Sequence, residues 1–100
     1  MTPPLNIRWN KRAIQQLDEA IEYIKTDSPA NSEKVRKEIL LKISELIKHP
    51  KLYNPDKYKI NNDGSFRAFE LYRYRISYRY IENEIRILRI RHTKMNPLKY

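Results

Sequence analysis

The sequence predicts a single α+β domain over residues 1–100: an N-terminal strand, an antiparallel hairpin of two helices, and a three- to four-stranded antiparallel sheet with the helices packed on one face. Three observations lead to this prediction. Residues 11–48 repeat apolar side chains at spacings of three and four, which is the helical period. Residues 66–92 alternate apolar or aromatic with charged side chains, which is the strand period. One hundred residues suffice for one hydrophobic core and not for two.

The chain begins with a short predicted strand at Leu5–Trp9, in which every second residue is apolar. A helix is expected over Lys11–Thr26, with Asn10 as its N-cap. Its apolar residues form one stripe: Ala13, Ile14, Leu17, Ala20, Ile21 and Ile24. The other side of this helix is polar and mixed in sign, so we interpret it as a core-facing helix without catalytic residues.

A second helix is expected from Pro29 to about Lys48, with Ser28 as its N-cap. Its inward-facing residues are Val35, Ile39, Ile43, Leu46 and Ile47. Glu38 and Lys42 are four residues apart on the outward side, where they could form an ion pair. The short link between the two helices predicts an antiparallel hairpin.

Residues 51–65 are rich in turn formers and contain a predicted short strand around Tyr58 and Ile60. Gly64, the only glycine, is expected to supply a positive φ in the turn that leads into Phe66. Because phosphate-binding loops need several glycines, this composition excludes a glycine-rich nucleotide site.

From Phe66 to His92 the chain predicts the strands of the main sheet. Around Tyr72 one parity is aromatic or apolar, with Tyr72, Tyr74, Ile76, Tyr78 and Tyr80, while the other carries Arg73, Arg75, Ser77 and Arg79. Such a strand has an aromatic face for the core and a cationic face for an anion. A turn is expected at Ile81–Glu84, with Asn83 in the left-handed conformation.

The last strand changes its apolar parity midway, between Ile87 and Leu88. A β-bulge at this point would restore the pattern. A central strand that is covered on different faces along its length is the alternative.

The formal charge of +9 is concentrated in the sheet, because residues 66–100 carry nine Lys and Arg against three Asp and Glu. This asymmetry suggests a polyanionic partner, either nucleic acid or an acidic protein segment. The absence of cysteine excludes disulfides and thiolate metal sites, and we expect no metal or cofactor. Without a membrane-length apolar run or a signal-peptide pattern, we expect a soluble cytoplasmic protein with no membrane partner.

Several segments, taken together and in order, resemble the RelE/ParE superfamily of bacterial type II toxins. They are WNKRAIQQLDEAIEYI, the helix end ELIKHP, the strands YRYRISYRYIENEIRILRIRH, and the tail HTKMNP with the final Tyr100. The resemblance implies an acidic antitoxin as partner, in a hetero-oligomer that covers the basic face. It also implies one of two activities, since RelE-like members cut messenger RNA in the ribosomal A site and ParE-like members inhibit DNA gyrase.

The resemblance to RelE-like ribonucleases implies a set of candidate catalytic residues: Arg67, Arg75, His92 and Tyr100. Arg75 matches their phosphate-binding arginine, and His92 matches a C-terminal histidine that some relatives use as acid or base. Further cations are candidates for RNA binding: Arg73, Arg79, Arg89, Arg91 and Lys94. We expect Arg67, Arg75 and Arg91 to gather on the sheet face that the helices leave bare.

Other features point away from the ribonuclease reading. Phe66 and Ala68 stand where some RelE-like enzymes carry lysines, and the long helical hairpin is similar to the ParE branch. His49, at the end of the second helix, is most simply a cation that interacts with the helix dipole. Because Arg75 and His92 nevertheless match the RelE-like pattern, the sequence favours a ribosome-dependent mRNA endoribonuclease, with a gyrase inhibitor as the alternative and a basic RNA-binding module as a weaker third reading.

Overall fold

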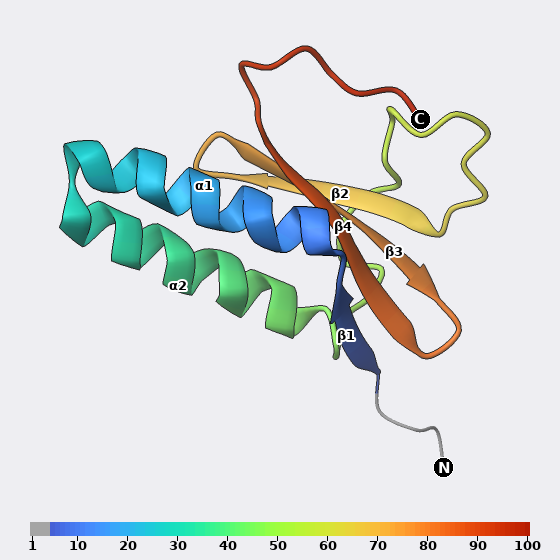
Figure 1. Ribbon diagram of the computed structural model, residues 1–100. Coiled ribbons are helices and arrows are strands. Elements are labelled where there is room, and N and C mark those ends of the chain that lie inside the picture. Colours follow the sequence, from blue (N-terminus) through green and yellow to red (C-terminus); the bar gives the residue numbers. More distant parts are fainter. Residues whose placement is uncertain (1–4) are drawn as a thin grey trace.

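The computed structural model describes residues 5–100 and has the predicted α+β architecture (Figure 1). The elements in chain order are β1 (Asn6–Trp9), α1 (Lys11–Asp27), α2 (Pro29–Glu45), β2 (Phe66–Leu71), β3 (Tyr74–Ile81) and β4 (Glu84–His92). The four strands form one sheet in the order β1-β4-β3-β2. β2, β3 and β4 are antiparallel neighbours, whereas β1 pairs with β4 in parallel, which the sequence pattern did not indicate.

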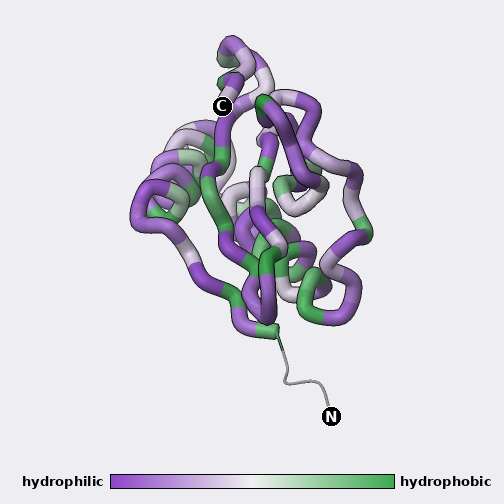
Figure 2. The backbone as a smooth tube through the Cα atoms, turned by 90° about the vertical axis from the view of Figure 1, so that its right-hand side faces the viewer, coloured by the Kyte–Doolittle hydropathy of each residue, from purple (hydrophilic) through white to green (hydrophobic). Residues whose placement is uncertain are grey.

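The helical hairpin lies on one face of the sheet, with α1 packed against β4 and α2 packed against α1. The core between the layers is built from the helix stripes and from alternate strand residues, among them Ile39, Ile76, Tyr78, Ile85 and Ile87. Hydrophobic and hydrophilic residues alternate along the strands in the side view, as the strand period requires (Figure 2). None of the helices described in residues 5–100 is long and apolar enough to cross a membrane.

Both helices begin directly after the residues that were predicted as their N-caps, Asn10 and Ser28. Ser28 caps α2 by accepting a hydrogen bond from the Asn31 N–H at 3.2 Å, and Pro29 occupies the first turn. Asn10 is the N-cap residue of α1, but its side chain makes no capping hydrogen bond.

The predicted end of α2 near Lys48 is wrong, because the helix stops at Glu45 and turns follow. Ile47 therefore leaves the helical stripe and is 40% exposed, contrary to its predicted inward position. The predicted Glu38–Lys42 ion pair is also absent among the described residues. Lys42 lies 3.8 Å from Glu45, and Glu38 accepts a hydrogen bond from the Tyr72 hydroxyl.

Three predictions about the loops and turns are wrong. Tyr72 and Arg73 are not in a strand but form the β2–β3 turn, with φ of 52° and 67°. In the β3–β4 turn it is Glu82, not Asn83, that has a positive φ (54°). Residues 51–65 contain an isolated bridge between Pro55 and Arg67 in place of the predicted strand at Tyr58 and Ile60.

Two other predictions are confirmed. Gly64 has a φ of 95°, in the region that side chains rarely adopt. The register between β3 and β4 shifts so that Ser77 faces Arg89 and Tyr78 faces Ile87. This shift leaves Leu88 as the extra residue of a bulge, at the point where the apolar parity changes.

Candidate functional site

The sheet face opposite the helices carries most of the strand arginines. Residues that pair across neighbouring strands share a face, and Arg75 pairs with Arg91, Ser77 with Arg89, and Arg79 with Arg86. We call this surface the arginine face: Arg75, Arg79, Arg86, Arg89 and Arg91. The aromatic and apolar parity, with Tyr74, Ile76 and Tyr78, is buried on the helix side.

Arg67 does not belong to the arginine face, and the expectation that it gathers there with Arg75 and Arg91 is wrong. It pairs with Tyr78, so its side chain lies on the helix-facing side, where Nη1 donates to the Tyr53 carbonyl at 2.7 Å. The two-residue turn at Tyr72 and Arg73 is the physical reason. It pairs odd residues of β2 with even residues of β3, which reverses the parity between the strands.

Asp56 is the centre of the arginine face, and the sequence analysis did not identify it. Its carboxylate is 1% exposed and accepts hydrogen bonds from Arg75 Nη2 at 2.8 Å, from the Tyr100 hydroxyl at 2.7 Å and from the Tyr58 N–H at 3.0 Å. Burial alone would raise the pKa of Asp56, but the hydrogen bonds from Arg75, Tyr100 and Tyr58 together outweigh it and lower that pKa. The only sequence signal was an acidic residue after Pro55 in a turn-rich loop.

Both terminal nitrogens of Arg75 bind carboxylates of this chain. Besides Asp56 it binds Glu70, at 3.0 Å from Nη1, and its guanidinium carbon lies 4.8 Å from the centre of the Tyr58 ring. Burial opposes its charge, but Asp56 and Glu70 outweigh this effect and raise the pKa of Arg75. Two carboxylates therefore already neutralise the arginine that was predicted to bind phosphate.

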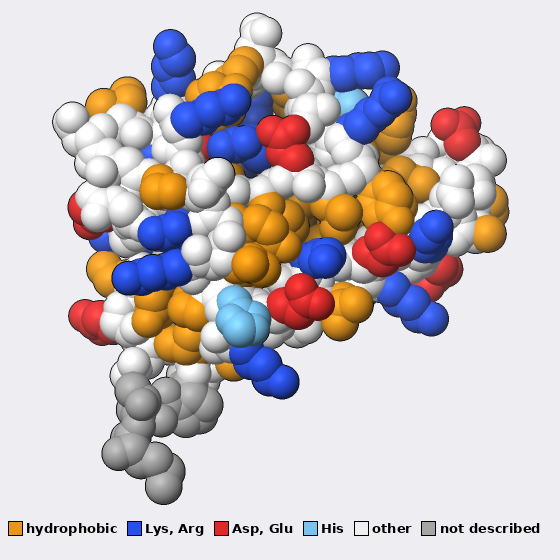
Figure 3. All heavy atoms as spheres, turned by 180° about the vertical axis from the view of Figure 1, so that it is seen from behind, with side chains coloured by type: hydrophobic (Ala, Val, Ile, Leu, Met, Phe, Trp, Pro, Cys, Tyr) orange, Lys and Arg blue, Asp and Glu red, His pale blue; other side chains and the backbone are white. Residues whose placement is uncertain are grey.

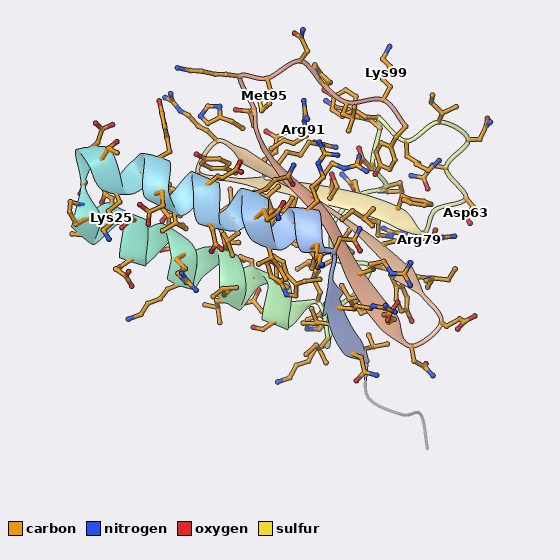
Figure 4. All side chains as sticks on the ribbon, viewed as in Figure 1. Lys25, Asp63, Arg79, Arg91, Met95 and Lys99 are labelled. Carbon is orange, nitrogen blue, oxygen red and sulfur yellow. The ribbon has the colours of Figure 1, made fainter. Side chains whose placement is uncertain are left out.

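The C-terminal segment, residues 93–100, lies across the arginine face (Figures 1 and 4). Its last residue, Tyr100, donates its backbone N–H to the Tyr58 carbonyl at 3.1 Å and covers Arg89, whose guanidinium carbon is 3.9 Å from the ring centre. Further along the segment, the Asn96 carbonyl accepts a hydrogen bond from Arg91 at 3.1 Å. Burial, and next the hydrogen bond to Asp56, raise the pKa of Tyr100, so its hydroxyl remains a donor.

A cavity of about 60 Å³ remains between this segment and the sheet, with Arg75, Ser77, Arg89 and Arg91 among its lining residues. Because about 10–15 Å³ of such space already holds one water molecule, the cavity suits a few waters or a small anion. It is too small for a nucleotide.

The ring of His92 lies on the other side of the sheet. His92 pairs with Tyr74, and the two rings meet edge to face with their centres 5.0 Å apart. Its Nδ1 accepts a hydrogen bond from the Lys94 N–H at 3.0 Å. Although His92 also borders the small cavity at the end of β4, its ring does not converge with Tyr100 on Arg75.

Of the predicted RNA-binding cations, Arg79, Arg89 and Arg91 lie on the arginine face, whereas Arg73 and Lys94 lie outside the strands. Arg79 lies 4.5 Å from the Phe66 ring centre and 3.9 Å from Asp63, a pair that Figure 4 shows at one end of the sheet. Arg73 is in the exposed β2–β3 turn, and Lys94 is exposed in the C-terminal segment. From behind, basic and acidic side chains are interspersed, without one continuous basic patch (Figure 3). Among residues 5–100 no three His, Asp or Glu side chains are grouped as metal ligands.

Comparison with known proteins identifies one family whose profile matches most of the chain. The profile of a protein family described as "ParE toxin of type II toxin-antitoxin system, parDE" matches residues 7–97. No curated protein sequence matches the chain.

Similar solved structures share the fold at low sequence identity. The chromosomal ParDE TA system from P. aeruginosa contains a chain with a TM-score of 0.69 and 20% identity, over 88% of this chain and 95% of that one. A mutant of the E. coli toxin RelE in the free state has a TM-score of 0.57 and 17% identity, over 92% and 86%. The YoeB dimer from Staphylococcus aureus has a TM-score of 0.57 and 18% identity, over 90% and 98%.

Proposed function

Because this chain belongs to the ParE toxin family, within the RelE/ParE superfamily of type II toxin-antitoxin toxins, we propose that it arrests growth by inhibiting DNA gyrase without hydrolysing nucleic acid. One observation carries this proposal: two arginines of the arginine face are already occupied by groups of this chain. Asp56 and Glu70 hold Arg75, and Tyr100 covers Arg89.

Metal-free RNA cleavage needs a proton acceptor, a proton donor and a free cation around one phosphate. Here Arg75 has two carboxylate partners, and the ring of His92 packs on the opposite side of the sheet. A proton-transfer group and a phosphate-binding cation on opposite sides of a packed sheet cannot act on the same bond. An inhibitor that acts by binding needs no such set of residues.

The ribosome-dependent endoribonuclease is the second candidate, and one observation favours it. Arg75, Arg89 and Arg91 share a face and line one cavity, next to Tyr100. Residues 93–100 would have to leave this face before messenger RNA could reach these arginines. The RNA-binding module is supported less, because the rings near the arginines, Tyr58, Phe66 and Tyr100, already contact cations of this chain.

We assign the gyrase contact to the helical hairpin, which projects beyond the sheet (Figure 1). On its α2 arm the adjacent residues Leu40 and Leu41 are 39% and 57% exposed. Neighbouring exposed leucines on a projecting helix are suited to a protein interface.

Two assays on the purified chain test the proposal. In the first, gyrase supercoils a relaxed plasmid in the presence of increasing amounts of the chain, and we expect supercoiling to fail. In the second, a translating extract reports transcript cleavage, and we expect none. Leu41→Lys should weaken the inhibition of gyrase by about tenfold or more, which corresponds to about 1.4 kcal/mol of binding free energy.

Leu52→Lys is the matched control, because Leu52 is 53% exposed but lies outside the hairpin. It should inhibit as well as the wild type. Transcript cleavage that disappears in His92→Gln but persists in His49→Gln would refute the proposal and establish the endoribonuclease. Equal losses in the two leucine variants would refute the role of the hairpin.

We further propose that the partners are an acidic antitoxin, which joins the chain in a hetero-oligomer, and gyrase in the cytoplasm. The similarity to a chain of a ParDE system supports the antitoxin. A small acidic protein encoded directly beside this chain is the expected genomic counterpart.

A further inference from the structure

The two-residue turn between β2 and β3 holds two ordinary residues in a backbone conformation that favours glycine. Tyr72 has a φ of 52° and Arg73 a φ of 67°. Hairpin turns with a positive φ at both central positions usually contain Asn and Gly, because a Cβ atom strains this conformation. Two other loop positions with a positive φ follow this preference, since they are Asn61 and Gly64. The β2–β3 turn therefore carries strain that an Asn-Gly pair would avoid.

Contacts with two other parts of the fold hold this turn in place. The Tyr72 hydroxyl donates a hydrogen bond to the Glu38 carboxylate of α2. The Arg73 carbonyl accepts a hydrogen bond from the Thr93 N–H at 2.8 Å. The side chains of both turn residues are nevertheless exposed, so the packing of the core does not require a tyrosine and an arginine here. Strained backbone that is held by its surroundings is typical of functional sites.

The hydrogen bond to Glu38 places Tyr72 beside the side of α2 that carries Leu41, which we assign to the gyrase contact. Lys34, Glu38 and Leu41 are spaced by four and three residues, so they lie on one side of the helix. Tyr72 also borders the same hollow as Lys34. The turn and this side of α2 form one surface, which we call the Tyr72 surface: Lys34, Lys37, Glu38, Leu41, Tyr72 and Arg73.

The composition of the Tyr72 surface suits a protein partner with acidic groups. Tyrosine and arginine are enriched among the residues that dominate binding at protein interfaces, and Leu41, which is 57% exposed, adds apolar area beside them. Within residues 5–100 no salt bridge engages Lys34, Lys37 or Arg73. These cations favour carboxylates on the partner. A nucleic acid fits less well, because a leucine and the carboxylate of Glu38 interrupt the cations.

We propose that the β2–β3 turn and α2 together bind the protein target of this chain, with the Tyr72 ring on an apolar part of the target and Arg73 and the two lysines on its carboxylates. The inference rests on the proposed function, in which the target is gyrase. It adds the turn to the helical hairpin as a contact, and it specifies an acidic surface on the target. The turn then keeps its two strained residues because they bind, although they lower the stability of the free chain.

Replacing the strained residues separates their effect on stability from their effect on binding. Arg73→Gly relieves the strain and should raise Tm by about 3 °C or more, because glycine adopts a positive φ freely. The same variant should need about tenfold more protein, or more, for half-maximal inhibition of gyrase supercoiling. Tyr72→Asn should weaken inhibition to a similar degree. Circular dichroism melts verify the fold and give Tm. A gain in stability together with a loss of inhibition is not expected of a merely structural residue.

Glu82→Gly is the matched control for the relief of strain. Glu82 is exposed and has a φ of 54° in the β3–β4 turn, outside the Tyr72 surface. This variant should also raise Tm, but it should inhibit gyrase as well as the wild type does. Lys57→Gly, at an exposed loop position, controls for the loss of one positive charge and should likewise inhibit normally.

Inhibition at the wild-type level by Arg73→Gly and Tyr72→Asn would overturn the proposal. So would an equal loss of inhibition in either control. A lower Tm in Arg73→Gly would also overturn it, because Arg73 would then stabilise the turn. Two further outcomes would assign the surface to another partner and refute the proposal: self-association of the chain that Tyr72→Asn abolishes, or binding of duplex DNA or single-stranded RNA that Arg73→Gly abolishes.

Growth arrest in cells that express the chain separates this proposal from the proposed function. If the wild type arrests growth without inhibiting gyrase, the proposed function fails, and growth decides the role of the turn. Arrest that is lost in folded Arg73→Gly but kept in Glu82→Gly then supports the turn as a target contact, whereas arrest in both overturns it. If the wild type and Arg73→Gly inhibit gyrase equally, the proposed function stands and the turn assignment fails. A wild-type chain that neither arrests growth nor inhibits gyrase refutes both.

Discussion

Replacing Asp56 with asparagine should destabilise the protein more than any other conservative change on the arginine face. The carboxylate is 1% exposed and accepts charge-assisted hydrogen bonds from Arg75 and from Tyr100. Breaking a buried ion pair costs about 3–5 kcal/mol. Because Arg75 keeps Glu70 at 3.0 Å, we expect the lower end of this range, about 3 kcal/mol.

Urea unfolding followed by circular dichroism at pH 7 measures this loss directly. In a domain of this size, about 1 kcal/mol corresponds to 4–8 °C in Tm, so the variant should melt more than about 10 °C below the wild type. Asp63→Asn is the control, since Asp63 also faces an arginine, Arg79 at 3.9 Å, but its side chain is 63% exposed. It should leave the urea midpoint nearly unchanged.

The direction of the Asp56 pKa shift determines how the stability loss in Asp56→Asn changes with pH. The pKa of Asp56 is lowered in the folded state, so its stabilising effect is fully present above the ordinary value of 3.8 and is lost as the pH falls through the lower folded value. The difference in stability between the wild type and Asp56→Asn should therefore be constant from pH 7 to about pH 5 and shrink below pH 4. A difference that stays constant in acid, or that matches the Asp63→Asn control, would refute the account of Asp56 as a buried charged centre.

Two further predictions concern the core and the hairpin. Tyr78 is fully buried, donates to the Pro50 carbonyl at 2.9 Å, and has a pKa that burial raises to about 12. The contribution of the Tyr78 hydroxyl to stability should be complete below pH 10, the ordinary pKa of tyrosine, and be lost as the pH rises toward 12. Tyr78→Phe should therefore cost about 1 kcal/mol of unfolding free energy at pH 7. In urea unfolding at alkaline pH, the variant should lose less stability with rising pH than the wild type does. Ser28→Ala removes the acceptor of the Asn31 N–H and should cost about 1 kcal/mol in the same assay, whereas Asn10→Ala, whose side chain makes no capping bond, should cost less.

Local patterns predicted the elements of this fold well. The Ser28 cap, Gly64, the bulge at Leu88 and most of the helix stripes depend on neighbours within a few residues and are as expected, but Ile14 and Ile47, predicted to face inward, are 46% and 40% exposed. The pattern was misleading at Tyr72, where strict alternation continues through a two-residue turn. A turn adopted by ordinary residues with positive φ has no strong sequence signal.

The sequence by itself determined that this chain is a small α+β domain with its charge on a sheet, because side-chain period and composition are properties of the chain alone. Only the tertiary structure determined on which side of the sheet those charged side chains lie and which groups they contact. The parity reversal across the β2–β3 turn moved Arg67 to the helix side, the ring of His92 packed against Tyr74, and a loop aspartate, Asp56, came to hold Arg75 and Tyr100. Asp56 lies 19 residues from Arg75 and 44 residues from Tyr100, and contacts at such separations arise only when the strands pair and the loops close over them.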